Sequence, residues 1–240
     1  MKEYLLTVEN LSLAHRDRFF QRQPEWVLQN LSFSILQNAS VSIVGDSATG
    51  KSSLIMALLN LTPLYSGTIF FKGKNIAFFS KKEKTQYRRN LQPVFQNYEA
   101  SLNPRLSVKN NLVHGFSNSL TSREKMEKCE YLLDMVGLSG GILAQHPDQL
   151  SGGEKQRISI VRALTTSPEI LLLDEPFSSL DILNQEKLLT LFLQIKSTLG
   201  ISYIFITHKL PLVKYFSDSV YRIRDGKLME VTDLNQLQDR

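Results

Sequence analysis

The sequence contains little cysteine and no long apolar run. Its one cysteine, Cys129, excludes an intrachain disulfide and a cysteine-built metal cluster, so the composition fits a reducing compartment. No apolar run approaches the roughly 18 residues needed to cross a bilayer. The apolar stretch near the N-terminus ends at the polar Glu9 and Asn10, so it is too short for a signal peptide. If the protein works at a membrane, we expect a partner to hold it there.

The excess of positive over negative charge is also small. The 240 residues carry a formal net charge of +5. That excess is too small to indicate a nucleic-acid partner, and we expect none. The densest basic run extends from Lys81 to Arg89 and is interrupted by Glu83 and by polar residues. We interpret this run as a solvent-exposed helix face rather than a binding patch.

Short β-rich runs alternate with helical patterns along most of the chain. Three compact apolar runs are too short for helices, as expected of strands buried on both faces: Val41–Val44, Ile170–Leu173 and Ile201–Ile206. After the first run, Ser52–Asn60 carries apolar residues at helical spacing. This alternation predicts an α/β fold with a mainly parallel central sheet.

The other regions of the chain differ from this pattern. The N-terminal part has three strand-like runs with few helices between them, which predict an antiparallel β subdomain: Tyr4–Ala14, Leu31–Ile35 and Gly67–Phe71. Residues 97–163 have mostly helical patterns. We expect residues 1–240 to form a single domain. In it, a helical subdomain (about 97–163) is inserted into a core with the antiparallel subdomain (about 1–96 and 164–240).

A phosphate-binding loop is the strongest local signal. Residues 45–52 match the pattern G-x-x-x-x-G-K-[ST] between a predicted strand and a predicted helix, the context that this pattern requires. Backbone N–H groups of such a loop, with the helix N-terminus behind them, bind phosphates. Lys51 is expected to reach the β- and γ-phosphates, and Ser52 to bind Mg²⁺. The predicted nucleotide-binding residues here are Gly45, Asp46, Ser47, Ala48, Thr49, Gly50, Lys51, Ser52 and Ser53.

Two adjacent acids follow the apolar run that ends at Leu173. Ligands of open α/β sheets bind at the carboxyl ends of strands. Asp174 is suited to hold Mg²⁺, and Glu175 to polarise an attacking water. Because neighbouring strand residues point to opposite faces, the two carboxylates can take different roles at one strand tip. An acid that merely caps a turn is the alternative, and the loop upstream favours the functional interpretation.

A second glycine motif, Leu150–Arg157, precedes another helical pattern. Its Ser-Gly-Gly start predicts an anion-binding helix end, with backbone N–H groups and the Ser151 hydroxyl available for phosphate. An ATPase with one self-contained site needs no second phosphate-binding end. A purely structural glycine turn would not explain this order of residues.

The segment Leu150–Glu154 resembles the signature motif of the ATP-binding cassette (ABC) family, and the resemblance covers nearly the whole chain in the right order. Gly45–Ser52 resembles the Walker A motif of that family. Ile170–Asp174 resembles its Walker B motif, followed by a catalytic glutamate at Glu175. The resemblance implies a P-loop NTPase core that binds ATP and Mg²⁺. It also implies that two subunits face head to tail, with each ATP between the loop of one and the Ser151 motif of the other.

The resemblance implies roles for further residues. Gln96 looks like the Q-loop glutamine, which senses Mg²⁺ and the γ-phosphate and connects to the transport subunit. Asp181 resembles the D-loop residue that crosses the dimer interface, and His208 the switch histidine that contacts the γ-phosphate. The implied catalytic residues are Glu175, His208 and Gln96. The implied signature contacts to ATP are Ser151, Gly152, Gly153 and Glu154, and the implied Mg²⁺ ligands are Ser52, Gln96 and Asp174.

The segment Ala100–Val108 is similar to ATPases of the dipeptide, oligopeptide and nickel importers. This implies a second ATP-binding subunit, identical or not, two transmembrane permease subunits and, indirectly, a substrate-binding protein. The chain is then expected at the cytoplasmic face of the cell membrane, where ATP-driven dimer closure energises import of nickel or another metal, or of short peptides. A soluble ABC protein acting on ribosomes or DNA is the alternative. A cassette that binds ATP without hydrolysing it is a third, against which Glu175 and His208 argue.

Four features depart from the pattern of the family. Ala48 stands where glycine is usual. His15 occupies the approximate place of the aromatic residue that stacks on adenine, and a nearby phenylalanine could substitute for it. Lys209 replaces the usual aspartate after the switch histidine. The end at Arg240, without the C-terminal extension common in the peptide group, favours nickel or another small solute.

Overall fold

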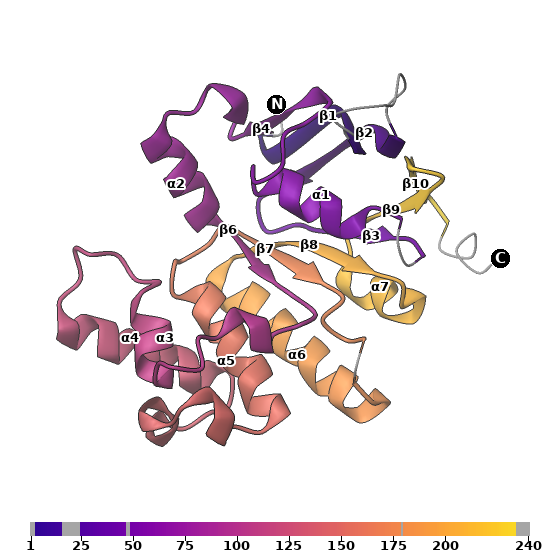
Figure 1. Ribbon diagram of the computed structural model, residues 1–240. Coiled ribbons are helices and arrows are strands. Elements are labelled where there is room, and N and C mark those ends of the chain that lie inside the picture. Colours follow the sequence, from indigo (N-terminus) through magenta and orange to yellow (C-terminus); the bar gives the residue numbers. More distant parts are fainter. Residues whose placement is uncertain (1–2, 16–24, 47–48, 179, 234–240) are drawn as a thin grey trace.

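The computed structural model describes residues 3–15, 25–46, 49–178 and 180–233, which form two sheets and the helices around them (Figure 1). The larger sheet has six strands in the order β10-β9-β3-β8-β7-β6. From β9 to β6 neighbouring strands pair in parallel, and β10 pairs antiparallel with β9. The predicted α/β fold with a mainly parallel sheet is therefore confirmed. The strands are β3 (Ser40–Val44), β6 (Leu91–Val94), β7 (Ile170–Asp174), β8 (Ser202–Thr207), β9 (Ser219–Arg224) and β10 (Lys227–Glu230).

The smaller sheet is antiparallel, with strands in the order β2-β1-β4-β5. They are β1 (Tyr4–His15), β2 (Glu25–Leu36), β4 (Ser66–Phe71) and β5 (Lys74–Asn75). β2 begins well before Leu31, where the sequence predicts its start. The prediction misses the first half of the strand because of an irregularity in its backbone. Asn30 has a φ of +52°, and the pairing of β2 with β1 shifts register beside it. A bulged strand loses the period-two alternation on which the prediction depends.

Helices cover the larger sheet and fill the segment between β6 and β7 in the sequence. Where the basic run lies, α2 has a largely exposed surface and one buried side chain, Tyr87, so the predicted solvent-exposed face is present. None of the helices formed by the described residues is long and apolar enough to cross a membrane. The α-helices are α1 (Lys51–Leu58), α2 (Lys81–Asn90), α3 (Val108–Val113), α4 (Ser122–Met135), α5 (Gly152–Leu164), α6 (Ile182–Leu199) and α7 (Leu210–Phe216). Four 3₁₀ helices are described: η1 (Ile76–Phe78), η2 (Glu99–Ser101), η3 (Gly140–Ala144) and η4 (Pro147–Gln149).

The larger sheet separates two apolar cores. Leu171 and Leu173 of β7 lie in a core shared with α4, α5 and α6. Ile170 and Leu172 of the same strand lie in a core shared with α1 and the smaller sheet. Alternation along the strand thus sends successive side chains to opposite layers. As a result α1 and α5, which follow the two glycine motifs, pack on opposite faces of the sheet (Figure 1).

At Gly67, β4 packs closely on β1. The φ of Gly67 is +93°, and a Cβ there would lie 2.5 Å from the carbonyl oxygen of Asn10 and 2.5 Å from Cα of Leu11. We expect Gly67→Ala to lower the free energy of unfolding by about 2–4 kcal/mol, because left-handed strain adds to overpacking. Gly73→Ala is the matched control, with a φ of +72° and no described heavy atom within 4 Å. It should cost about 1 kcal/mol, and equal losses in urea unfolding would contradict the close packing.

Candidate active site

The predicted phosphate-binding loop joins the end of β3 to the start of α1. Gly50 is the N-cap of α1, with a φ of +90° and no side chain to cap the helix, so the first N–H groups of α1 are left for a ligand. A Cβ on Gly50 would lie 2.8 Å from a side chain of β2, so packing as well as conformation requires glycine. The Thr49 hydroxyl donates to the Asp46 carbonyl at 2.9 Å. Ser47 and Ala48 lie outside the described residues.

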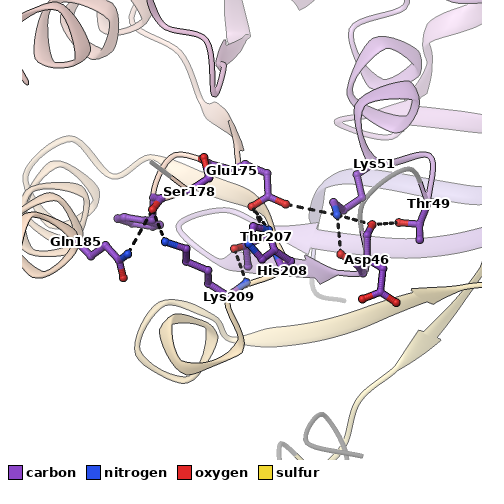
Figure 2. Close-up of polar contacts among 11 residues, drawn as sticks. Asp46, Thr49, Lys51, Glu175, Ser178, Gln185, Thr207, His208 and Lys209 are labelled. Atoms are coloured by element: carbon purple, nitrogen blue, oxygen red, sulfur yellow. Dashed lines mark hydrogen bonds and ion pairs between the residues drawn. The ribbon is translucent and has the colours of Figure 1, made fainter. Parts of the chain in front are cut away.

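Lys51, the first residue of α1, is nearly buried and turns back toward the loop (Figure 2). Its Nζ donates to the carbonyl oxygens of Gly45 at 2.6 Å and of Asp46 at 2.7 Å. The same Nζ lies 3.4 Å from Oε1 of Glu175. The ammonium is therefore fixed beside the loop, and a carboxylate from another strand end balances part of its charge.

Glu175 lies between two strand ends and the loop. β7 ends at Asp174, and the N–H of Glu175 donates to the Ile206 carbonyl of β8 at 3.0 Å. One carboxylate oxygen faces Lys51, and the other lies 2.8 Å from Nδ1 of His208 (Figure 2). Glu175 is 9% exposed. A nearly buried carboxylate is thus held between an ammonium and an imidazole.

The backbone at Glu175 shows that strand alternation does not separate the side chains of the two acids. Alternation along a strand predicts that Asp174 and Glu175 point to opposite faces. The strand ends at Asp174, however, and Glu175 has a left-handed φ of +49°. A turn rather than strand alternation therefore directs its side chain toward His208. Such a φ in a residue other than glycine costs roughly 1–3 kcal/mol and persists only where the surroundings hold it.

Asp174 is half-buried at the tip of β7. Burial raises the pKa of Asp174 above its usual value, and the charge of Glu175 adds to the rise. The Lys51 ammonium and a hydrogen bond with Ser52 oppose the rise in pKa. The Ser52 hydroxyl, the Asp174 carboxylate and the Lys51 ammonium are therefore neighbours, although they come from two elements far apart in the sequence.

Asp174, predicted to hold Mg²⁺ with Ser52 and Gln96, shares a hydrogen bond with the first of these residues and a cavity with the second. Ser52 contacts its carboxylate directly. Gln96, just after β6, lines an open cavity of about 840 Å³ together with Asp174. Ser53 follows Ser52 in the first turn of α1. The donors at this end of the sheet are hydroxyl, amide and carboxylate oxygens, the hard ligands that Mg²⁺ prefers.

The Ser151 motif begins α5 on the opposite face of the sheet from α1. The sequence predicts a Ser151 hydroxyl available for phosphate. In the structure this hydroxyl instead donates to Oε2 of Glu154 at 2.7 Å and accepts from the Glu154 N–H, because a capping box brings that carboxylate within reach. These bonds lower the pKa of Glu154. Gly152 and Gly153 are exposed, and no hydrogen bond among the described residues joins this motif to the loop.

Two other predicted site residues belong to β1 and to the start of α6. Asp181 is the exposed N-cap of α6, and its carboxylate accepts from the N–H of Asn184 at 2.9 Å and from the side-chain amide of Asn184 at 2.7 Å. His15 ends β1, but its side chain lies outside the described residues, as do the nearby phenylalanines Phe19 and Phe20. The adenine-stacking residue therefore remains a prediction.

Two side chains for which the sequence predicts no role hold the turn after Glu175. Gln156 of α5 donates to the Pro176 carbonyl at 3.0 Å. Lys209, singled out only as a departure from the family pattern, donates to the Phe177 carbonyl at 2.6 Å. A polar residue on the buried face of a helix was an available signal for Gln156. No local pattern predicts the contact of Lys209.

Comparison with known proteins identifies the family. A sequence profile described as "ABC transporter" matches residues 28–178, which is more than half of the chain. The chain belongs to the ABC transporter family. It is accordingly an ATP-binding protein and an ATPase of that family.

Relatives of this ABC ATPase match it over nearly its full length. It is 38% identical over 229 residues to the oligopeptide transport ATP-binding protein AppF of Bacillus subtilis (strain 168), covering 93% of this chain and 70% of AppF. It is 33% identical over 240 residues to the oligopeptide transport ATP-binding protein OppF of the same organism, covering 98% of this chain and 79% of OppF.

Two solved structures of ABC proteins share the fold. One is cbiO1 from Clostridium perfringens, described as part of the ABC transporter complex cbiONQ. It has a TM-score of 0.84 and 27% identity, over 95% of this chain and 87% of that one. The other is a dimeric post-hydrolysis state of the ATP-binding cassette MJ0796 bound to ADP and Pi. It has a TM-score of 0.81 and 25% identity, over 94% of this chain and 97% of that one.

The raised pKa of Asp174 predicts that its ionised carboxylate lowers the stability of this ABC ATPase. An acid with a raised folded pKa destabilises the fold once ionised, and this cost disappears as pH falls through the folded pKa toward the usual value. Without nucleotide and Mg²⁺, Asp174→Asn should therefore have a higher unfolding temperature than wild type at pH 7. The difference should shrink toward about pH 4.

Thermal unfolding across this pH range checks the prediction for Asp174. Asp46→Asn is the control, because the Asp46 side chain is exposed and little change is expected. An Asp174→Asn variant that unfolds at a lower temperature than wild type at pH 7 would contradict the assignment.

Proposed function

We propose that this chain is the ATP-binding and hydrolysing subunit of an importer for short peptides, and that it closes with a second ATP-binding subunit over shared ATP. The observation that carries the proposal is the Glu175 carboxylate held between Lys51 and His208, beside the phosphate-binding loop. These groups supply phosphate binding and a positioned base. The second anion-binding end, at Ser151, lies with α5 on the other face of the sheet.

Each group beside the loop has a distinct task. Lys51 and the first N–H groups of α1 would bind the β- and γ-phosphates. Glu175 would accept the proton of the attacking water. The His208 side chain, which is 47% exposed, would contact the γ-phosphate. Because Lys51 and His208 both contact Glu175, a γ-phosphate would compete for them and leave the carboxylate free for the water.

Mg²⁺ suits the oxygen donors around Asp174. We place Ser52, Gln96 and Asp174 as the residues that would hold it. The Asp174 carboxylate is half-buried and lies close to the like charge of Glu175, which raises its pKa. A cation would relieve both effects. When bound, Mg²⁺ would neutralise charge on the phosphates.

A second ATP-binding subunit, identical or not, would complete the site. Its exposed α5 start would supply the N–H groups of the Ser151 motif to ATP bound on the first subunit. Beside the exposed Asp181, Ile182 is 73% exposed and Leu183 is 69% exposed. Large exposed apolar side chains suit burial between subunits. ATP would then favour the closed pair and hydrolysis would release it, a two-state change that permease subunits can follow.

The remaining partners and the solute are proposed from the relatives. AppF and OppF are named for oligopeptide transport, and a Brucella ovis relative with 33% identity is named a putative peptide import ATP-binding protein. These names favour short peptides over nickel, and transport over action on ribosomes or DNA. We place the chain at the cytoplasmic face of the membrane, with two permease subunits, a substrate-binding protein and permease contact near Gln96. In this arrangement residues 97–163 act as a helical subdomain of the single domain.

Glu175→Gln tests the proposed base. The amide keeps the size of the side chain but cannot accept the proton, so ATP turnover should fall by about 10²–10⁴-fold while ATP affinity is retained. Turnover is measured on the chain assembled with its membrane partners, and affinity by titration with a fluorescent ATP analogue. Glu186→Gln, an exposed residue of α6, is the control and should behave as wild type. Near-normal turnover of Glu175→Gln would remove Glu175 from this role.

A further inference from the structure

The turn that follows Glu175 is held by side chains from the turn itself, from α5 and from the segment after β8. The Glu175 carbonyl accepts from the Ser178 hydroxyl at 3.0 Å, within the turn itself. The next carbonyl, of Pro176, accepts from Gln156 of α5 at 3.0 Å. The third, of Phe177, accepts from Lys209 at 2.6 Å. Three successive carbonyls are thus fixed, and the third is fixed from the segment that carries His208.

Phe177 is anchored at both its side chain and its backbone. Its buried ring packs edge-on against Phe205, at 5.5 Å between centroids, and against Phe192 at 6.0 Å. Its carbonyl also accepts a longer bond of 3.4 Å from Nε2 of Gln185. The bond from Lys209 is the shorter one and comes from a charged donor, and charge-assisted hydrogen bonds are the stronger kind.

Lys209 is itself well fixed for this contact. Its N–H donates to the Thr207 hydroxyl at 2.9 Å, which shapes the backbone just after β8. Its side chain is partly buried and crosses to the turn after β7, as Figure 2 shows. The Phe177 carbonyl is the one acceptor found for its ammonium in the described part of the chain. The contact therefore links two segments that follow different strands.

This link acts on the backbone that carries Glu175. The left-handed φ of +49° at Glu175 must be held by its surroundings. Residues 207–209 contact this region through two residues. The His208 imidazole and N–H both meet the carboxylate, and, as the second contact, the Lys209 ammonium holds the carbonyl two residues after Glu175. Without the second contact, the turn can relax and carry the carboxylate away from His208.

We propose that Lys209 is a positioning residue for ATP hydrolysis, which ties the turn after Glu175 to the segment of His208 and so fixes where the carboxylate meets water. The proposal rests on the proposed role of Glu175 as the base. Lys209 touches no group that we assign to ATP, so its effect falls on turnover rather than on nucleotide binding. An aspartate, usual at this place in the family, has a shorter side chain and no donor when ionised, so it could not make the contact with the Phe177 carbonyl.

The test compares substitutions at Lys209 in the chain assembled with its membrane partners. Lys209→Met should lower kcat about tenfold, equal to about 1.4 kcal/mol in activation free energy, with KM and ATP affinity within about twofold of wild type. Lys209→Arg keeps a cationic donor and should restore most of kcat. Lys209→Asp, which also lacks the donor, should have a kcat no higher than that of Lys209→Met. Lys214→Met, an exposed lysine of α7, is the matched control and should leave kcat unchanged.

Three results would overturn the proposal for Lys209: a wild-type kcat in Lys209→Met, a kcat restored by Lys209→Asp, or KM and ATP affinity impaired as much as kcat. The last result would mean a general structural role rather than positioning. A failure of the proposed function looks different. Unimpaired hydrolysis by Glu175→Gln in the same assay would contradict the assignment of Glu175 as the base. Hydrolysis by the wild-type complex that no peptide stimulates would contradict the assignment of short peptides as the solute.

Discussion

The polar contacts of Glu175 with Lys51 and His208 are the constraint on which the rest of the site depends. Removing a carboxylate from water costs several kcal/mol unless opposite charge and hydrogen bonds replace the lost hydration. Glu175 is 9% exposed and has such partners in Lys51 and His208. The three residues follow β7, β3 and β8, which are neighbours in the sheet with parallel pairing. Parallel pairing brings their carboxyl ends to one edge, so the topology of the sheet builds the site.

The same sheet explains why one chain supplies only part of what its motifs predict. Leucines of β7 alternate between the two cores, and this places α1 and α5 in different layers. The phosphate-binding loop and the Ser151 motif are each attached to one of these helices. In the function proposed above, a single nucleotide uses both motifs when two chains meet. In the account proposed here, the turn after Glu175 is tied both to α5 and to the segment that carries His208, because Gln156 and Lys209 hold it.

The sequence predicts what is local and repeated, and it misses what tertiary contacts decide. Val41–Val44 and Ile170–Leu173 indicate buried strands because every residue is apolar, and residues 45–52 predict a loop whose chemistry tolerates few alternatives. The first half of β2 escapes prediction because the backbone at Asn30 breaks the alternation. The direction of Glu175 escapes because a left-handed turn in a residue other than glycine has no sequence pattern. The capping of Ser151 by Glu154 could have been predicted from their spacing.

The shared site is the central claim, and the dependence of ATP hydrolysis on protein concentration tests it most directly. Turnover per chain is measured over a dilution series, alone and with an added second ATP-binding subunit, while light scattering reports the oligomeric state. The account predicts that turnover per chain rises as chains associate, or when the second subunit is added. Full turnover by chains that remain monomeric, unchanged by concentration or by the second subunit, would contradict it.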